Sequence, residues 1–143
     1  MKKSLLFLIT IIFIVAICVI TSYNKLKSEK LNVAKFNLKY EEYNRDNVDG
    51  LDIVTLINRA TSNNEYYKIN KNAENIYILD NEYSIEIYIV FDGTTYSMEK
   101  LNNSGLNEFI RYFADVNFKC IDVKYHKKTG RIASLTFEAI DYK

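Results

Sequence analysis

The chain has 143 residues, with 19 basic and 18 acidic side chains, and it lacks proline and tryptophan. A formal net charge of +1 argues against the strongly basic character of a nucleic-acid-binding protein. Two cysteines are too few for a disulfide framework. The four glycines are far apart in the sequence, which excludes a glycine-rich phosphate-binding loop.

An uncharged apolar run extends from Leu5 to Ile20. Counted from Ser4 to Tyr23, the segment reaches the roughly 20 residues that a helix needs to cross the hydrocarbon core of a bilayer. Thr10 and Thr21 are tolerable there because a hydroxyl can bond the backbone carbonyl one turn earlier. The sequence therefore predicts a transmembrane helix over residues 4–23.

A cleaved signal peptide is the alternative interpretation, since its apolar core is typically about 7–15 residues and ends at a small-x-small site. Here the apolar core is longer, and two more apolar residues follow the nearest such site, Ala16-Ile17-Cys18. A lipoprotein site would need a small residue at position 17. These lengths and flanks favour an uncleaved, single-pass anchor.

The flanking lysines bear on orientation. Lys2 and Lys3 favour a cytoplasmic N-terminus, whereas Lys25, Lys27 and Lys30 favour the opposite. We expect the protein in the cell membrane with its C-terminal domain extracytoplasmic, and the reverse orientation stays open. From Glu41 onward, 12 basic residues accompany 17 acidic ones, so this domain is mildly acidic, which argues against a nucleic-acid partner.

Neither Gly nor Pro occurs between the apolar run and Gly50, so the helix can continue beyond the membrane. Val33, Phe36, Tyr40 and Tyr43 follow at helical spacing and form one aromatic stripe. We predict one helix from Ser4 to Asn44. Residues 24–44 would form a helical stalk that continues the anchor and lays the stripe on a sheet, and residues 45–143 would form a small α+β domain.

Two shorter helices are expected in this domain. The first covers residues 47–64, is capped by Asp49 or Gly50, and buries four apolar positions: Ile53, Leu56, Ile57 and Ala60. The second covers residues 105–115, is capped by Ser104, and has its apolar positions at Leu106, Phe109, Ile110 and Phe113. Residues 65–74 are predicted to be a loop.

Five strands are predicted, over residues 76–79, 84–91, 94–101, 118–125 and 132–140. In the second, Ile85, Ile87, Ile89 and Phe91 alternate with the outward positions Glu86, Tyr88 and Val90. Asp92-Gly93 predicts a two-residue hairpin turn, and Gly130 a positive φ in the loop 126–131. In the last two strands the expected buried residues are Ile121, Val123, Tyr125, Leu135 and Phe137. The fold class is α+β, with helices on an antiparallel sheet.

Cys120 and His126 are the only residues that resemble a nucleophile and its base. Six residues along one strand at about 3.4 Å each separate them by about 20 Å, beyond hydrogen-bond reach. We expect Cys120 to be a half-buried apolar residue and His126 a solvated turn residue. Asp122 and Lys124, on the strand face shared with Cys120, are the remaining enzyme candidates. We predict no catalytic residue and a non-enzymatic protein.

The sequence contains two acidic segments that resemble metal-binding sites only superficially. Asp46 to Gly50 (DNVDG) lacks the alternating ligands and the Glu at the twelfth position of a calcium loop, and Asp80-Asn81-Glu82 is typical of a turn. We predict no metal and no cofactor. Four tyrosines could form an aromatic platform for a glycan or peptide, although packing on the sheet is the favoured alternative: Tyr66, Tyr67, Tyr77 and Tyr83.

A long apolar N-terminal helix that runs into an antiparallel sheet resembles type IV pilins and pseudopilins in shape. Those proteins carry a Gly-Phe or Gly-Met processing site and an early Glu, whereas Met1 to Phe7 reads MKKSLLF. The alternative function is therefore a pilin-like or competence-like structural subunit, a homo-oligomer that assembles through its apolar helix.

A closer resemblance is to an uncharacterised family of small single-pass membrane-anchored proteins of low-GC Gram-positive bacteria. It lies in FNLKYEEY (36–43), VDGLDIVTLINRATSNN (48–64), TTYSMEKL (94–101) and FKCIDVKYHKKTGRI (118–132). The resemblance implies no activity and no site residue. We expect a membrane-anchored, envelope-associated domain that acts by contact with an unidentified protein partner.

Overall fold

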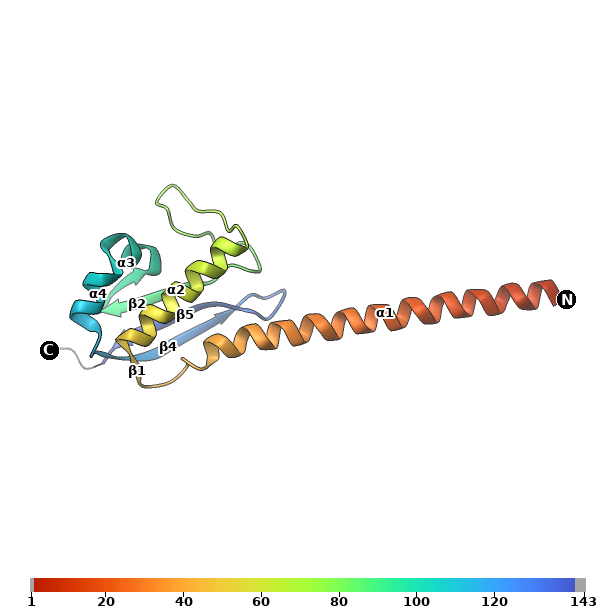
Figure 1. Ribbon diagram of the computed structural model, residues 1–143, viewed down its shortest axis with the longest axis horizontal. Helices are drawn as coiled ribbons and strands as arrows, with labels where there is room; N and C mark the ends of the chain where they lie inside the picture. Colours follow the sequence, from red (N-terminus) through yellow and green to blue (C-terminus); the bar gives the residue numbers. More distant parts are fainter. Residues whose placement is uncertain (1, 141–143) are drawn as a thin grey trace. The chain divides into compact units, whose positions relative to one another are not determined.

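The computed structural model describes residues 2–140, and only the backbone of Lys2, Ser104 and Leu106. The chain is divided into two compact units, Met1–Lys35 and Phe36–Lys143, and the second is called the head below. The elements in chain order are α1 (Lys2–Glu41), β1 (Val48–Asp49), α2 (Gly50–Tyr66), β2 (Glu86–Phe91), β3 (Thr94–Ser97), α3 (Met98–Ser104), α4 (Leu106–Phe113), β4 (Asn117–Tyr125) and β5 (Ile132–Ala139) (Figure 1).

The first unit consists of the N-terminal part of α1. It is long and apolar enough to span a membrane, and none of its most apolar stretch is buried. The hydroxyl of Thr10 donates to the carbonyl of Leu6 at 2.9 Å, and that of Thr21 to the carbonyl of Ile17 at 2.9 Å. Both hydroxyls are therefore satisfied inside the helix, as the sequence predicts, and neither needs water.

The head is built on a five-stranded sheet of order β1-β4-β5-β2-β3. The α+β class and the number of strands are confirmed. The sheet is mixed, however, because β2 and β5 pair in parallel, with Ile87 opposite Leu135. Between these two strands the chain passes through β3, α3, α4 and β4, a connection long enough for parallel pairing. The expectation of an antiparallel sheet throughout is wrong for this one pair.

Within the described part of the head, up to residue 140, three shorter helices follow α1, not the two that the sequence predicts. The predicted strand 94–101 ends at Ser97, whose side chain accepts a hydrogen bond from the Lys100 backbone N–H and so caps α3. Gly105 occupies the N-cap position of α4 in place of the predicted Ser104. Its φ of 94° is a conformation that glycine adopts without strain. The Leu106 side chain lies outside the described residues.

One further strand prediction is wrong and one strand was not predicted, whereas the turn predictions are accurate. Residues 76–79 do not form a strand but a loop, in which Tyr77 makes an isolated β-bridge with Lys71. The strand that the sequence does not predict is the short β1. Asp92 and Gly93 have φ values of 47° and 74°, as a type I′ hairpin turn requires, and Gly130 has the predicted positive φ of 72°.

One hydrophobic core joins the helices to the sheet. All four predicted positions of α2 are buried in it, as are Ile85, Ile87 and Ile89 of the second predicted strand. The last turns of α1 also enter this core: Tyr40 is 1% exposed, Tyr43 is buried, and Phe36 packs against them. Burial raises the pKa of Tyr40 to about 12, so its phenol stays protonated. The head thus begins inside α1.

A β-bulge changes which residues of β4 are buried. Cys120 pairs with Phe137, but Asp122 pairs with Thr136, so Ile121 has no partner on β5. Neighbouring residues of β5 face opposite sides of the sheet, and Asp122 therefore lies on the face opposite to Cys120. Ile121 and Tyr125 are each 46% exposed, which contradicts their predicted burial.

Two buried asparagines fasten helices to strands. The amide of Asn37, in α1, donates to the Gly130 carbonyl at 2.9 Å and accepts from the Ile132 N–H at 3.0 Å. Asn64, in α2, donates to the Ile85 carbonyl at 2.7 Å and accepts from its N–H at 2.9 Å. Each amide therefore satisfies one backbone donor and one backbone acceptor. Three of these four hydrogen bonds are buried, and the one to the Gly130 carbonyl is partly buried.

Replacing Asn37 with Ala should destabilise the head by about 1–3 kcal/mol, because the Ile132 N–H and the Gly130 carbonyl lose their partner. Thermal unfolding of the full chain in mild detergent measures this loss. Asn44→Ala, at an exposed position just after α1, is the matched control and should leave the midpoint unchanged. Equal midpoints for both variants would contradict the proposed role of Asn37.

Candidate functional site

Three tyrosines form a contiguous exposed surface at the end of α2 and in the loop before β2. Tyr67 packs edge-to-face on Tyr66, with ring centroids 4.9 Å apart, and stacks on Tyr83 at 4.5 Å. Tyr66 is 79% exposed, and Tyr67 and Tyr83 are each 36% exposed. Tyr77 lies apart in the core. The structure therefore brings together three of the four tyrosines considered as an aromatic platform.

Arg131 lies against these rings. Its guanidinium carbon is 3.8 Å from the ring centroid of Phe36, 4.8 Å from that of Tyr83 and 5.5 Å from that of Tyr67. Such cation–π contacts are worth roughly 0.5–2 kcal/mol each. We call Phe36, Tyr66, Tyr67, Tyr83 and Arg131 the tyrosine–arginine cluster. The sequence indicates its three tyrosines but not Phe36 or Arg131 as their neighbours, because the members come from four separate segments.

The Arg131 side chain has no polar partner among the described residues. The residue is only 7% exposed, its Nε is buried without a hydrogen-bond acceptor, and no described carboxylate lies within 4.0 Å. A buried cation without an acceptor is costly, and native proteins rarely leave one unexplained.

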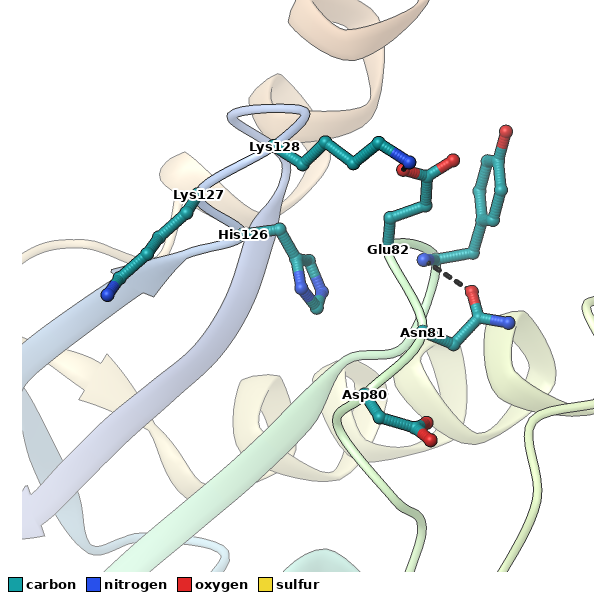
Figure 2. Close-up of a pocket in the computed structure, with 7 residues that line it drawn as sticks. Asp80, Asn81, Glu82, His126, Lys127 and Lys128 are labelled. Carbon is teal, nitrogen blue, oxygen red and sulfur yellow. Dashed lines mark hydrogen bonds and ion pairs between the residues drawn. The ribbon is translucent and has the colours of Figure 1, made fainter.

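An open hollow of about 470 Å³ adjoins the cluster through Tyr83. Figure 2 shows the segment 126–128 facing the segment 80–82 across it, with Lys128 reaching toward Glu82. Their charged atoms are 3.7 Å apart, and the Lys128 side chain is 88% exposed. An ion pair that is this exposed contributes little to stability. The lining is thus polar and mixed in charge: Asp80, Asn81, Glu82, Tyr83, His126, Lys127 and Lys128.

His126 has a structural role that the sequence does not predict. Its ring Nε2 lies 2.7 Å from the Ser84 carbonyl. Because a carbonyl only accepts, Nε2 carries a hydrogen and donates it to the Ser84 carbonyl. The backbone N–H of His126 donates to the Arg131 carbonyl at 2.8 Å. The predicted solvated turn residue is in fact half-buried and joins the β4–β5 loop to the segment before β2.

The enzyme candidates do not converge. The Cys120 thiol is buried and contacts the Asp122 carbonyl at 3.7 Å, and burial raises the pKa of this thiol. A thiol with a raised pKa is a poor nucleophile. Asp122 and Lys124 form an ion pair at 3.5 Å on the opposite face of the sheet. Cys120 therefore shares no site with His126, Asp122 or Lys124.

Two buried glutamates meet at the start of α3. The Oε1 of Glu86 accepts from the Met98 N–H at 3.1 Å, and the Oε1 of Glu99 accepts from the Tyr77 N–H at 3.0 Å. Both side chains are almost fully buried, and neither Oε2 has another described partner. Burial and the charge of the neighbouring Glu99 raise the pKa of Glu86 to about 9. Glu86 therefore keeps its proton at neutral pH.

The burial of Glu86 contradicts the outward position that the sequence predicts for it. The alternation of β2 is real, but the other face of the strand is covered at this point, where Glu86 contacts the first turn of α3. Nothing within the strand sequence indicates this cover. The glutamate pair is a structural feature that only the folded head creates.

Residues 2–140 contain no group of three or more His, Cys, Asp or Glu side chains that could hold a metal ion. Asp46 pairs with Lys119 at 3.1 Å, and Asp49 precedes α2 without a side-chain capping bond. The chain matches no protein-family model, no curated protein and no solved structure.

The proton on Glu86 predicts a pH dependence of stability. The pKa of Glu86 is raised from 4.5 to about 9 on folding. The contribution of this carboxyl to the free energy of unfolding is therefore full below about pH 4.5, where it is protonated in both states, and is lost as the pH rises toward 9. Glu86→Gln keeps the acceptor for Met98 and mimics the protonated side chain. This variant should be more stable than the wild type by on the order of 1–3 kcal/mol at pH 8, with a smaller difference at pH 5.

Thermal unfolding at pH 5, 6.5 and 8 checks this prediction, and the difference between the two proteins is the readout because other groups also titrate. Glu138→Gln, an exposed substitution on β5, is the control and should follow the wild type at each pH. A Glu86→Gln profile parallel to that of the wild type would show that Glu86 holds no extra proton.

Proposed function

We propose that this protein is a single-pass membrane protein whose head acts by contact with a protein partner, without catalysis, at the cell surface or in a membrane assembly. The observation that carries the proposal is the exposed apolar helix. Its large apolar side chains between Leu5 and Ile20 are 43–70% exposed. Burying apolar surface is worth about 25 cal/mol per Å², so a surface of this kind is unfavourable in water and favourable in lipid.

The character of the head supports a binding role. It has its own core, which includes the end of α1, and Cys120 and His126 contact different groups, the carbonyls of Asp122 and Ser84. Exposed, contiguous aromatic residues are more typical of interaction surfaces than of ordinary surface. The exposed tyrosines of the tyrosine–arginine cluster meet this description.

We also propose that the head is extracytoplasmic and that the chain is related to the small single-pass proteins of low-GC Gram-positive bacteria that it resembles. The placement is supported by Lys2 and Lys3 at the N-terminal end of the apolar run. The opposite orientation, with the head in the cytoplasm, would bring Lys25, Lys27 and Lys30 to the anionic leaflet.

A second candidate function is a pilin-like or competence-like subunit that assembles through the apolar helix. The exposed apolar surface of that helix could pack against copies of itself. This candidate predicts oligomers in mild detergent that disappear when the apolar run is disrupted. A protein that is monomeric in mild detergent would contradict it.

The anchor can be tested by fractionation. Ile12→Asp together with Val15→Asp places two charges in the middle of the apolar run, where each costs about 2.5–3.5 kcal/mol in lipid. We expect the wild type in the membrane fraction and this variant released into the soluble or aggregated fraction. Leu38→Asp with Leu51→Asp, at exposed apolar positions of the head, is the matched control and should stay in the membrane fraction.

Protease treatment of intact cells tests the orientation in the same experiment. An extracytoplasmic head should be digested, and a cytoplasmic head should be protected until the cells are lysed. A wild-type protein recovered in the soluble fraction would contradict the anchor itself.

A further inference from the structure

We propose that Arg131 binds a carboxylate on an acidic peptide segment of the partner protein, with the exposed tyrosines of the tyrosine–arginine cluster as the surface around it. This inference deepens the proposed function, on which it rests, because it names a site and a chemistry for the contact between the head and its partner.

The arginines of the head differ in how their charge is neutralised. Arg45 pairs with Asp52 at 2.7 Å and Arg59 pairs with Glu42 at 2.8 Å, although their side chains are 53% and 34% exposed. Arg131 is far more buried, yet it has no carboxylate and no acceptor among the described residues. Arg45 and Arg59 are neutralised by carboxylates of the head, and Arg111 is exposed to solvent beside the Tyr112 ring. The buried Arg131 is the one left with unused hydrogen-bond donors away from solvent, among the residues that the structure describes.

The guanidinium of Arg131 is held in place before any ligand arrives. Phe36, Tyr67 and Tyr83 contact it, and the backbone on both sides is fixed. Asn37 binds Gly130 and Ile132, and the Arg131 carbonyl accepts from the His126 N–H. A side chain immobilised by the fold loses little entropy on binding, which strengthens even a single contact.

The chemistry of the cluster indicates the ligand. The planar fork of a guanidinium matches a carboxylate or a phosphate, which it can bind with two parallel hydrogen bonds. Tyr66, Tyr67 and Tyr83 add ring faces and phenol groups, and Tyr and Arg are the residue types that dominate binding energy at protein interfaces. Asp80 and Glu82 in the adjoining hollow offset Lys127 and Lys128. This balance favours a singly charged carboxylate over a doubly charged phosphate.

The test uses the full chain, labelled with ¹⁵N and held in zwitterionic detergent, which contributes no net charge. The readout is the Nε–H resonance of Arg131, identified by its absence from the spectrum of Arg131→Lys. The probes are the capped peptide Ac-Gly-Glu-Gly-NH₂, its neutral counterpart Ac-Gly-Gln-Gly-NH₂, and inorganic phosphate. Thermal unfolding with the same probes gives a second measurement that does not depend on the Arg131 signal.

We expect the Glu peptide to shift the resonance and raise the unfolding midpoint with a dissociation constant in about the millimolar range, and the Gln peptide to do neither. Arg131→Met should remove the thermal response. Tyr66→Ala, at a position 79% exposed, should weaken binding about 3–10-fold without changing the midpoint of the free protein. Lys100→Met, at an exposed position of α3 outside the hollow, is the control and should bind as the wild type does.

An equal response to both peptides, no response to the Glu peptide, or a response kept in Arg131→Met would overturn the inference. A stronger response to phosphate than to the Glu peptide would overturn the assignment to an acidic peptide in favour of a phosphate-bearing ligand. None of these results would affect membrane fractionation, so failure of this site is distinguishable from failure of the proposed anchor.

Discussion

The head depends on one interaction above the others, the seating of the end of α1 against the start of β5. Asn37 gives the Ile132 N–H an acceptor and the Gly130 carbonyl a donor, and Tyr40 fills the core beside it. Buried backbone groups must be paired, so the start of β5 is complete only when this part of α1 is present. The same helix that supplies the apolar run thus supplies part of the core of the head.

This seating also explains how the tyrosine–arginine cluster arises. Arg131 lies between the two residues that Asn37 binds, so the interaction that completes β5 also places the guanidinium against Phe36. His126 ties the same loop to Ser84, next to Tyr83. The cluster is held by contacts of the fold itself. Within residues 2–140 the fold places aromatic rings around the Arg131 guanidinium and no carboxylate within ion-pair distance, which leaves this cation without a described partner.

Much of the fold was predictable from local patterns, and the rest depends on interactions between distant segments. The stripe of α2, the alternation in β2, the Asp92-Gly93 turn and Gly130 are local signals, and each is confirmed. The bulge at Ile121 and the parallel pairing of β2 with β5 depend on strand partners that no single segment reveals. Likewise Glu86 and Arg131 look like ordinary surface residues in the sequence, and only their neighbours in space bury them.

The most direct test of this dependence on α1 compares two soluble fragments of the head, residues 36–143 and residues 45–143. The shorter fragment lacks Asn37, Tyr40 and Tyr43, whereas both contain the whole sheet and α2 to α4. We expect the longer fragment to show one cooperative thermal transition by circular dichroism, and the shorter one to unfold at a much lower temperature or fail to fold. Equal midpoints for the two fragments would show that the end of α1 is not part of the head's core.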